Sequence, residues 1–249
     1  MSDVTKHIGS RIRLYRKLLG LTIDDLADGI HKSKSTVSKY ETGSVSIDAE
    51  TLFDIAGILR VPVSKLVDYD TGRVDRSGSA SSPKGFFNSP GKYYMYHLSN
   101  SGKILKSVVQ FHFPVSERDD FSVELYNDLA DYENLQRCRF YYSGTVSFSD
   151  LYTNMVFSNQ INVSEKAFVI AGNPLNNSDI TLGLVTGISN AFLVPISYKS
   201  LFSRGPLEDD DLILDMLRLT KENISDIKKR NMLVLANSLH SLREMEKDL

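Results

Sequence analysis

Apolar positions recur with a helical period along the first quarter of the chain. In residues 4–19 they fall on one side of a helix, basic residues lie elsewhere, and Gly20 is placed to end the helix. The pattern returns in residues 48–59, where Asp48 is the N-cap candidate. Pro62 then suits the first position of another short helix. The pattern therefore predicts helices on both sides of the segment that lies between them.

Residues 21–43, in that segment, predict two short helices joined by a tight turn. Thr22 and Asp25 have the spacing of a capping box, which starts the first helix. Ser33 is the N-cap candidate of the second helix, and Gly43 ends it. The outward face of this second helix consists of Lys34, Ser35, Thr36, Ser38 and Lys39. Because short hydroxyls and long cations suit base edges and phosphates, we interpret the pair of helices as a DNA-reading unit.

The same segment resembles the helix-turn-helix of lambda-repressor-like regulators, the Cro and CI type that is also called the XRE family. Ten residues match the family pattern in register, namely Leu21, Thr22, Leu26, Ala27, Ile30, Ser33, Val37, Ser38, Glu41 and Gly43. The resemblance covers about the first quarter of the chain. It implies a domain of five helices that binds double-stranded DNA.

Three positions depart from the family pattern. Ile23 stands where the family usually has a glutamine that helps to hold a phosphate, His31 replaces the turn glycine, and Lys32 replaces an apolar residue. We expect His31 to adopt a left-handed backbone conformation, which His tolerates better than a β-branched residue does. For Lys32, a phosphate contact and a solvated side chain remain as alternatives.

The resemblance also implies roles for individual residues. Residues that match the base-contacting positions in the major groove are Lys34, Ser35 and Lys39, with Thr36 and Ser38 as nearby candidates. Contacts to phosphates at helix ends are expected from Thr22, Ser33 and Ser44. Arg16 and Glu41 match a pair that has a structural role in the family.

The rest of the chain changes character twice. Residues 70–92 are rich in Gly, Ser and Pro and predict a linker, in which Phe86 and Phe87 either dock on the next domain or begin its first strand. Residues 93–200 contain seven or eight strand-like runs, which predict a β-sandwich or a barrel-like sheet. Beyond Pro206 the pattern predicts one long helix or two in tandem, which pack on the sheet or pair with a second chain.

Composition narrows the function without assigning one. The formal net charge of -2 means that DNA binding must rest on a local patch. Cys138, the only cysteine, excludes an intramolecular disulfide and fits a reducing compartment; we expect a buried structural thiol, with a redox sensor as the alternative. No run approaches the roughly 18 apolar residues that span a bilayer, and the N-terminus lacks a signal peptide core. We therefore expect a cytoplasmic protein without a membrane partner.

Catalytic and metal chemistry find little support in the sequence. Ala171-Gly172 resembles the dipeptide that self-cleaving repressors cut, but no serine and lysine follow at the separation that such proteases use. His97 and His112 have no further ligands at metal-binding spacing, so we expect satisfied structural histidines. The glycine-rich run 183–189 lacks the lysine of a phosphate loop. We expect no enzyme, no cofactor and no metal.

Together these patterns predict a multidomain α + β protein. The predicted parts are a helix-turn-helix DNA-binding domain at 1–69, a linker at 70–92, and a β-rich sensor or dimerisation domain at 93–249 that ends in helices. Expected partners are a DNA operator, a second copy of the chain, and a small-molecule or peptide effector. Alternatives are control by a partner protein through the C-terminal domain, and a DNA-binding head that carries an enzymatic domain.

Tyrosines are frequent in the β-rich region, where they suit either an aromatic ligand site or the ordinary core and strand faces. The residues in question are Tyr93, Tyr94, Tyr96, Tyr141, Tyr142 and Tyr152. For any single ring the packing role is the expectation, whereas ligand sensing by the domain as a whole stays open.

Overall fold

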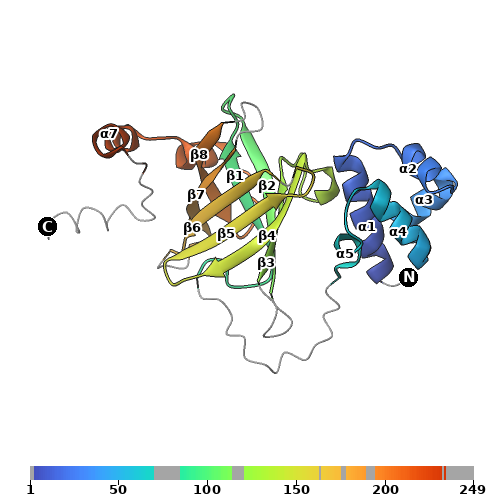
Figure 1. The fold of residues 1–249 in the computed structure, drawn as a ribbon. Helices are drawn as coiled ribbons and strands as arrows, with labels where there is room; N and C mark the ends of the chain where they lie inside the picture. The colour runs from blue at the N-terminus through green and yellow to red at the C-terminus, as the bar shows by residue number, and fades with distance from the viewer. Residues whose placement is uncertain are drawn as a thin grey trace, which may run out of the picture. The chain divides into compact units, whose positions relative to one another are not determined.

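The computed structural model describes residues 3–69, 85–113, 121–162, 164–174, 178–188, 194–231 and 233. The chain divides into two compact units, a helical one and one built on a β-barrel (Figure 1). Met1–Ser77 and Glu133–Arg139 form the first unit, and Gly78–Tyr132 and Phe140–Leu249 form the second. Within the described part of the chain, no helix combines the length and apolar character needed to cross a membrane.

The helical unit contains the five helices that the sequence predicts. They are α1 (Asp3–Leu18), α2 (Ile23–Gly29), α3 (Lys34–Glu41), α4 (Ala49–Ile58) and α5 (Ser64–Val67). The side chains of Thr22, Ser33 and Asp48 accept from backbone amides three residues ahead, so the predicted N-caps of α2, α3 and α4 are confirmed. The last helix begins at Ser64 rather than at Pro62, since Val63 occupies the N-cap position.

Close packing fixes α1 against α3. The core of the unit includes Ile12, Leu26, Val37 and Ile55, which are all buried. At Gly9, in the middle of α1, an added Cβ would lie 2.2 Å from the carbonyl oxygen of Tyr40 in α3. Only glycine lets the two backbones approach this closely, so the position of α3 depends on this residue.

The turn between α2 and α3 has the backbone that the sequence predicts. His31 has a φ of 54°, so the expected left-handed conformation is confirmed. Gly43, just after α3, also has a positive φ of 68°, and a Cβ there would meet the backbone of Lys6 at 2.6 Å. Both ends of α3 are therefore set by residues that tolerate this conformation.

Cys138 follows a 3₁₀ helix, η1 (Leu135–Arg137), that belongs to the helical unit. The thiol is buried, and this burial raises its pKa to about 12. The expectation of a buried thiol is confirmed, and because only the thiolate reacts readily, the raised pKa favours the structural role over the redox sensor.

Eight antiparallel strands close into the barrel, in sequence order around it (Figure 1). They are β1 (Gly91–Leu98), β2 (Ile104–His112), β3 (Ser122–Asn127), β4 (Phe140–Phe148), β5 (Tyr152–Asn159), β6 (Lys166–Gly172), β7 (Ile180–Ile188) and β8 (Pro195–Ser203). Pairing of Met95 in β1 with Phe202 in β8 closes the sheet. The structure therefore has the barrel and not the sandwich, the other architecture that the pattern allowed.

Aromatic side chains fill much of the barrel core. The rings of Phe86 and Phe87 are buried there, and the centroid of the Phe87 ring lies 5.0 Å from that of Phe111 and 5.6 Å from that of Phe202. Of the two alternatives for this pair, docking on the barrel is the one that holds. Residues 70–84, most of the predicted linker, lie outside the described residues.

Two helices follow the barrel. Ile213 and Leu217 of α6 (Asp210–Leu217) pack with Tyr96 and Leu201, so this helix covers the outer face of β1 and β8. The second, α7 (Lys221–Arg230), buries no residue among those described. The rest of the predicted helical stripe, from residue 234 onward, lies outside the described residues.

Candidate nucleic-acid interface

The polar residues of α3 lie on its solvent-exposed side. Exposed members are Lys34, Ser35, Ser38 and Lys39, and Thr36 is half-buried. On the opposite side of the helix, Val37 and Tyr40 are buried in the core. The helical period thus presents hydroxyls and cations to solvent as one continuous face, which we name the α3 face.

Hydroxyl groups gather where α3 begins. Ser33 Oγ accepts from the Thr36 amide at 3.1 Å, and it lies 2.8 Å from both Ser35 Oγ and Thr36 Oγ1. The first amides of a helix carry partial positive charge and lack partners within the helix. The start of α3 therefore combines hydroxyls and amides that can bind a phosphate.

Lys34 is held across the turn by an acidic residue that the sequence analysis missed. Its Nζ lies 2.7 Å from Asp24 Oδ2 in α2, and both side chains are more than half exposed, at 64% and 58%. Exposed pairs of this kind contribute only about 0.2 to 1 kcal/mol, so a phosphate or base edge can compete for Lys34. Lys34 and Asp24 are ten residues apart, and this spacing does not predict a contact, because the contact depends on the angle between α2 and α3.

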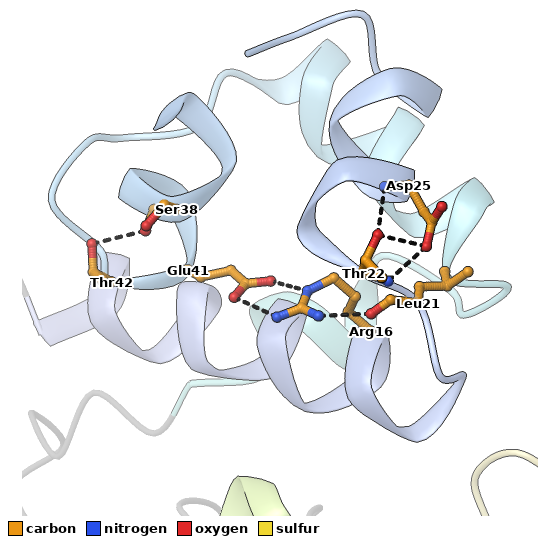
Figure 2. Close-up of polar contacts among 7 residues, drawn as sticks. All are labelled: Arg16, Leu21, Thr22, Asp25, Ser38, Glu41 and Thr42. Atoms are coloured by element: carbon orange, nitrogen blue, oxygen red, sulfur yellow. Dashed lines mark hydrogen bonds and ion pairs between the residues drawn. The ribbon is translucent and has the colours of Figure 1, made fainter. Parts of the chain in front are cut away.

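Arg16 and Glu41 form the main polar contact inside the helical unit (Figure 2). Arg16 Nε lies 2.5 Å from Glu41 Oε1, and Nη2 donates to Oε2 at 2.9 Å. Arg16 Nη1 also donates to the carbonyl oxygen of Leu21 at 2.7 Å. The side chains are 8% and 4% exposed, so this bidentate pair ties α1 to the last turn of α3 and to the loop before α2.

The expected phosphate contacts lie at helix ends, and all three residues are exposed. In Figure 2, Thr22 starts α2, where its hydroxyl accepts from the Asp25 amide at 3.1 Å and its own amide donates to Asp25 Oδ2 at 2.7 Å. Thr22 Oγ1 also donates to Asp25 Oδ2 at 2.7 Å, and the hydrogen bonds that the carboxylate accepts from the Thr22 hydroxyl and amide lower the pKa of Asp25. Ser44 Oγ, beyond the end of α3, lies 2.8 Å from the hydroxyl of Thr42, which donates to Ser38 O.

Residues 12–66 match the HTH_3 family, which is described as helix-turn-helix. The chain carries an HTH_3 domain. This domain spans the C-terminal part of α1, all of α2 to α4 and most of α5, and it includes the α3 face and the Arg16–Glu41 pair. The likeness to lambda-repressor-like regulators is therefore confirmed for this part of the chain.

Two relatives of the HTH_3 region are HTH-type transcriptional regulators from Sinorhizobium medicae (strain WSM419) and Rhizobium meliloti (strain 1021). Each is 34% identical over 95 residues, which is 38% of this chain and 66% of the relative. The chain thus spans just under two thirds of the length of each relative. Among solved structures, the DNA-binding domain of BldD is 25% identical over 27% of this chain and 97% of that chain, with a TM-score of 0.25.

The two strand histidines differ in their partners. His112 Nε2 lies 3.1 Å from Glu124 Oε2, so this histidine is satisfied as expected. His97 Nδ1 is buried and has no hydrogen-bond partner among the described residues, so the expectation of a satisfied histidine is wrong there. Among those same residues, no group of three or more His, Cys, Asp and Glu could hold a metal ion.

Proposed function

We propose that this protein is a sequence-specific DNA-binding transcriptional regulator that acts as a homodimer. The observation that carries the proposal is the α3 face, an exposed set of hydroxyls and cations on the second helix of an HTH_3 domain. The buried Arg16–Glu41 pair supports it, because the pair fixes the helix that would enter the major groove.

In this proposal Lys34, Ser35 and Lys39 contact base edges, and Thr36 and Ser38 lie close enough to assist. The hydroxyls and amides at Thr22, Ser33 and Ser44 would position the helix through phosphates, which carry no sequence information.

A single HTH_3 domain contacts only a few base pairs, so useful affinity requires two such domains on half-sites about one helical turn apart. Residues 93–249 would provide the pairing of two chains and the response to an effector.

Fluorescence anisotropy of the full chain on tiled DNA from upstream of its own gene tests the proposal. We expect one tile to bind far more tightly than the others at two salt concentrations. Lys34→Ala should weaken binding to that tile by about 1 to 3 kcal/mol and to the other tiles by less, if Lys34 reads a base. Lys166→Ala, which removes an exposed charge from the barrel, is the matched control. Binding of the wild-type chain that shows no preference among tiles would contradict the proposal.

Asp24→Asn sharpens the same assay. Asp24 holds Lys34 and adds negative charge near the α3 face, so its neutralisation should tighten DNA binding by a few tenths of a kcal/mol to about 1 kcal/mol. The gain should vanish in the Lys34→Ala background. A gain that persists there would show that Asp24 acts by general repulsion of phosphates rather than through Lys34.

A further inference from the structure

The inside of the barrel differs between its two ends. Strand alternation turns every second residue inward, in phase with buried core residues such as Met95, Phe157 and Phe202. Near one end these positions are aromatic and pack on Phe87. Toward the other end polar residues gather among the inward positions, and we name these residues the polar end: His97, Ser107, Asn127, Tyr142, Asn159, Glu165, Tyr198 and Ser200.

Glu165 lies at the centre of the polar end and is 8% exposed. Its Oε1 accepts from the hydroxyl of Tyr142 at 2.5 Å, and its Oε2 accepts from Asn159 Nδ2 at 3.0 Å. Burial, and then the charge of Glu165, raise the pKa of Tyr198 to about 12. Among the described residues, no Lys or Arg pairs with Glu165. A buried carboxylate without a cation is costly, so the polar end is electrostatically incomplete.

Two further polar groups of the polar end are unsatisfied. His97 Nδ1 and Ser200 Oγ are buried without a hydrogen-bond partner among the described residues, and the residues are 7% and 0% exposed. They lie on the neighbouring strands β1 and β8. His97 and Ser200 are the next inward-facing residues after Met95 and Phe202, which pair where these two strands meet. A buried polar group without a hydrogen bond destabilises the fold, so such groups are rare in folded proteins unless a ligand or water completes them.

Aromatic faces surround the same groups. The ring of His97 stacks on that of Tyr198, with centroids 4.9 Å apart and planes 29° apart. Burial lowers the pKa of His97 to about 4, so the imidazole is neutral near neutral pH and supplies no charge to Glu165. The polar end thus combines one carboxylate, electron-rich rings, a neutral imidazole and a free hydroxyl.

We propose that the polar end of the barrel interior binds a small organic ammonium ion. The ammonium group would pair with Glu165 and lie against the rings of Tyr142 and Tyr198, because cations are attracted to aromatic faces. Polar atoms elsewhere on the ligand would bond to His97 and Ser200. An anion would be repelled by the Glu165 carboxylate, because charges interact strongly in a low-dielectric interior. A purely apolar ligand would leave His97 Nδ1 and Ser200 Oγ without hydrogen bonds. The interior of an eight-stranded barrel is either filled by side chains or holds one small ligand.

This inference deepens the proposed function, since it names the chemical class of the effector. It rests on that function only for the consequence that the ligand changes DNA binding. Binding of the ligand to the barrel is a separate property that can be measured without DNA.

Calorimetric titration of the full chain provides the direct test. The probes are methylammonium, tetramethylammonium and benzylammonium chlorides, with potassium chloride as the salt control. Benzyl alcohol and benzoate repeat the shape of benzylammonium without its positive charge. We expect saturable binding of at least one ammonium probe, with one ion per chain, and no binding of the alcohol, the benzoate or the salt.

Variants locate the site. Glu165→Gln keeps the shape of the side chain but removes its charge, and it should weaken ammonium binding by roughly tenfold or more. Ser200→Ala should weaken those probes that bond to its hydroxyl, whereas Ser197→Ala, on the outward face of the same strand, should have no effect. Circular dichroism establishes that each variant is folded, and Ser200→Ala carries the test if Glu165→Gln unfolds.

Nuclear magnetic resonance of the imidazole nitrogens gives a second readout, because the chain has only five histidines. The Nδ1 resonance of His97, assigned with a His97→Asn variant, should shift on addition of the bound probe. The proposal is overturned if no ammonium probe binds, if benzyl alcohol or benzoate binds instead, or if binding is unchanged in both Glu165→Gln and Ser200→Ala.

The two proposals fail in distinguishable ways. Ammonium binding without selective DNA binding would contradict the proposed regulator function and support the proposed ligand site. Selective DNA binding without ammonium binding would contradict the proposed ligand site and support the proposed regulator function. An operator affinity that changes with the bound ammonium probe, in the wild type but not in Glu165→Gln, would join the two.

Discussion

The α3 face and the polar end of the barrel are both proposed to bind a partner through polar groups, but these groups lie in opposite settings, exposed in the first and buried in the second. Ser35 on α3 lies in solvent and contacts another hydroxyl, whereas Ser200 in the barrel is buried and contacts none among the described residues. Water can satisfy every group of the α3 face, so its residues say only that the partner is polar. Groups in the polar end are shielded from bulk solvent, so the hydrogen bonds and charge that they lack define the proposed ligand more closely.

The two regions also differ in what holds them in place. A buried bidentate pair anchors α3 from behind, and the exposed residues of the α3 face are free to change without loss of the fold. In the polar end, the same side chains that would bind the ligand also form the core. Substitutions should therefore separate stability from binding in the first region and combine them in the second.

The largest expected effect comes from the anchor of α3. Glu41→Ala leaves the Arg16 guanidinium buried without its carboxylate and should destabilise the helical unit by about 3 to 5 kcal/mol. Hydrogen–deuterium exchange of the α1 and α3 amides in the full chain reads out this unit by itself. Glu50→Ala, an exposed glutamate in the first turn of α4, is the control and should change protection little. Equal protection in both variants would mean that the pair does not anchor α3.

The next largest expected effect is a loss of barrel stability at acid pH, caused by the burial of His97 in the polar end. The folded-state pKa of His97, about 4, lies below its ordinary 6.5, so between these values the unfolded chain binds a proton that the folded barrel does not. Barrel stability should therefore fall as the pH is lowered from 6.5 through 4, by up to about 3 kcal/mol. Urea unfolding at several pH values measures this change.

Two variants isolate the contribution of His97 to that pH dependence. His97→Asn should remove it, whereas His31→Asn, at an exposed turn in the helical unit, should leave the barrel unchanged. An undiminished acid response in His97→Asn would assign the effect to other groups and weaken the contrast between the two regions.

The smallest effect concerns the backbone contact behind the α3 face. A Cβ at Gly9 would overlap the carbonyl oxygen of Tyr40, so Gly9→Ala should destabilise the helical unit by about 1 to 3 kcal/mol. Gly57→Ala in α4 adds the same methyl group where no atom lies within 4 Å. It should stabilise slightly, because alanine favours a helix. Equal effects of the two substitutions on amide exchange would contradict the close approach of α1 and α3.

The sequence predicted the helical unit well because its determinants are local. The caps at Thr22, Ser33 and Asp48 lie within one turn of the helices they start, and His31 sits at a turn whose backbone the pattern dictates. The Lys34–Asp24 contact was missed because it depends on how two helices meet. Base and phosphate contacts of the α3 face stay predictions.

The barrel could be predicted only as a set of strands. Alternation of apolar and polar residues is the same in a sandwich and in a barrel, and the choice between them rests on pairing of β1 with β8, which are about a hundred residues apart. The polar end was missed for the same reason. Asn159 is six residues from Glu165, but Tyr142 and Tyr198 come from other strands, and no local pattern connects them to Glu165.

Closure of the barrel has a consequence for how two chains can associate. In an open sheet, an edge strand leaves a row of unpaired amides and carbonyls to which another chain can add. Here residues 94–96 of β1 pair with residues 201–203 of β8, so a second copy cannot extend the sheet along these stretches. Side chains on the outer surface remain for contact between barrels, and Val156, Phe168 and Ile170 lie exposed there on β5 and β6. Closure of the barrel thus limits the addition of strands from one chain to the sheet of another.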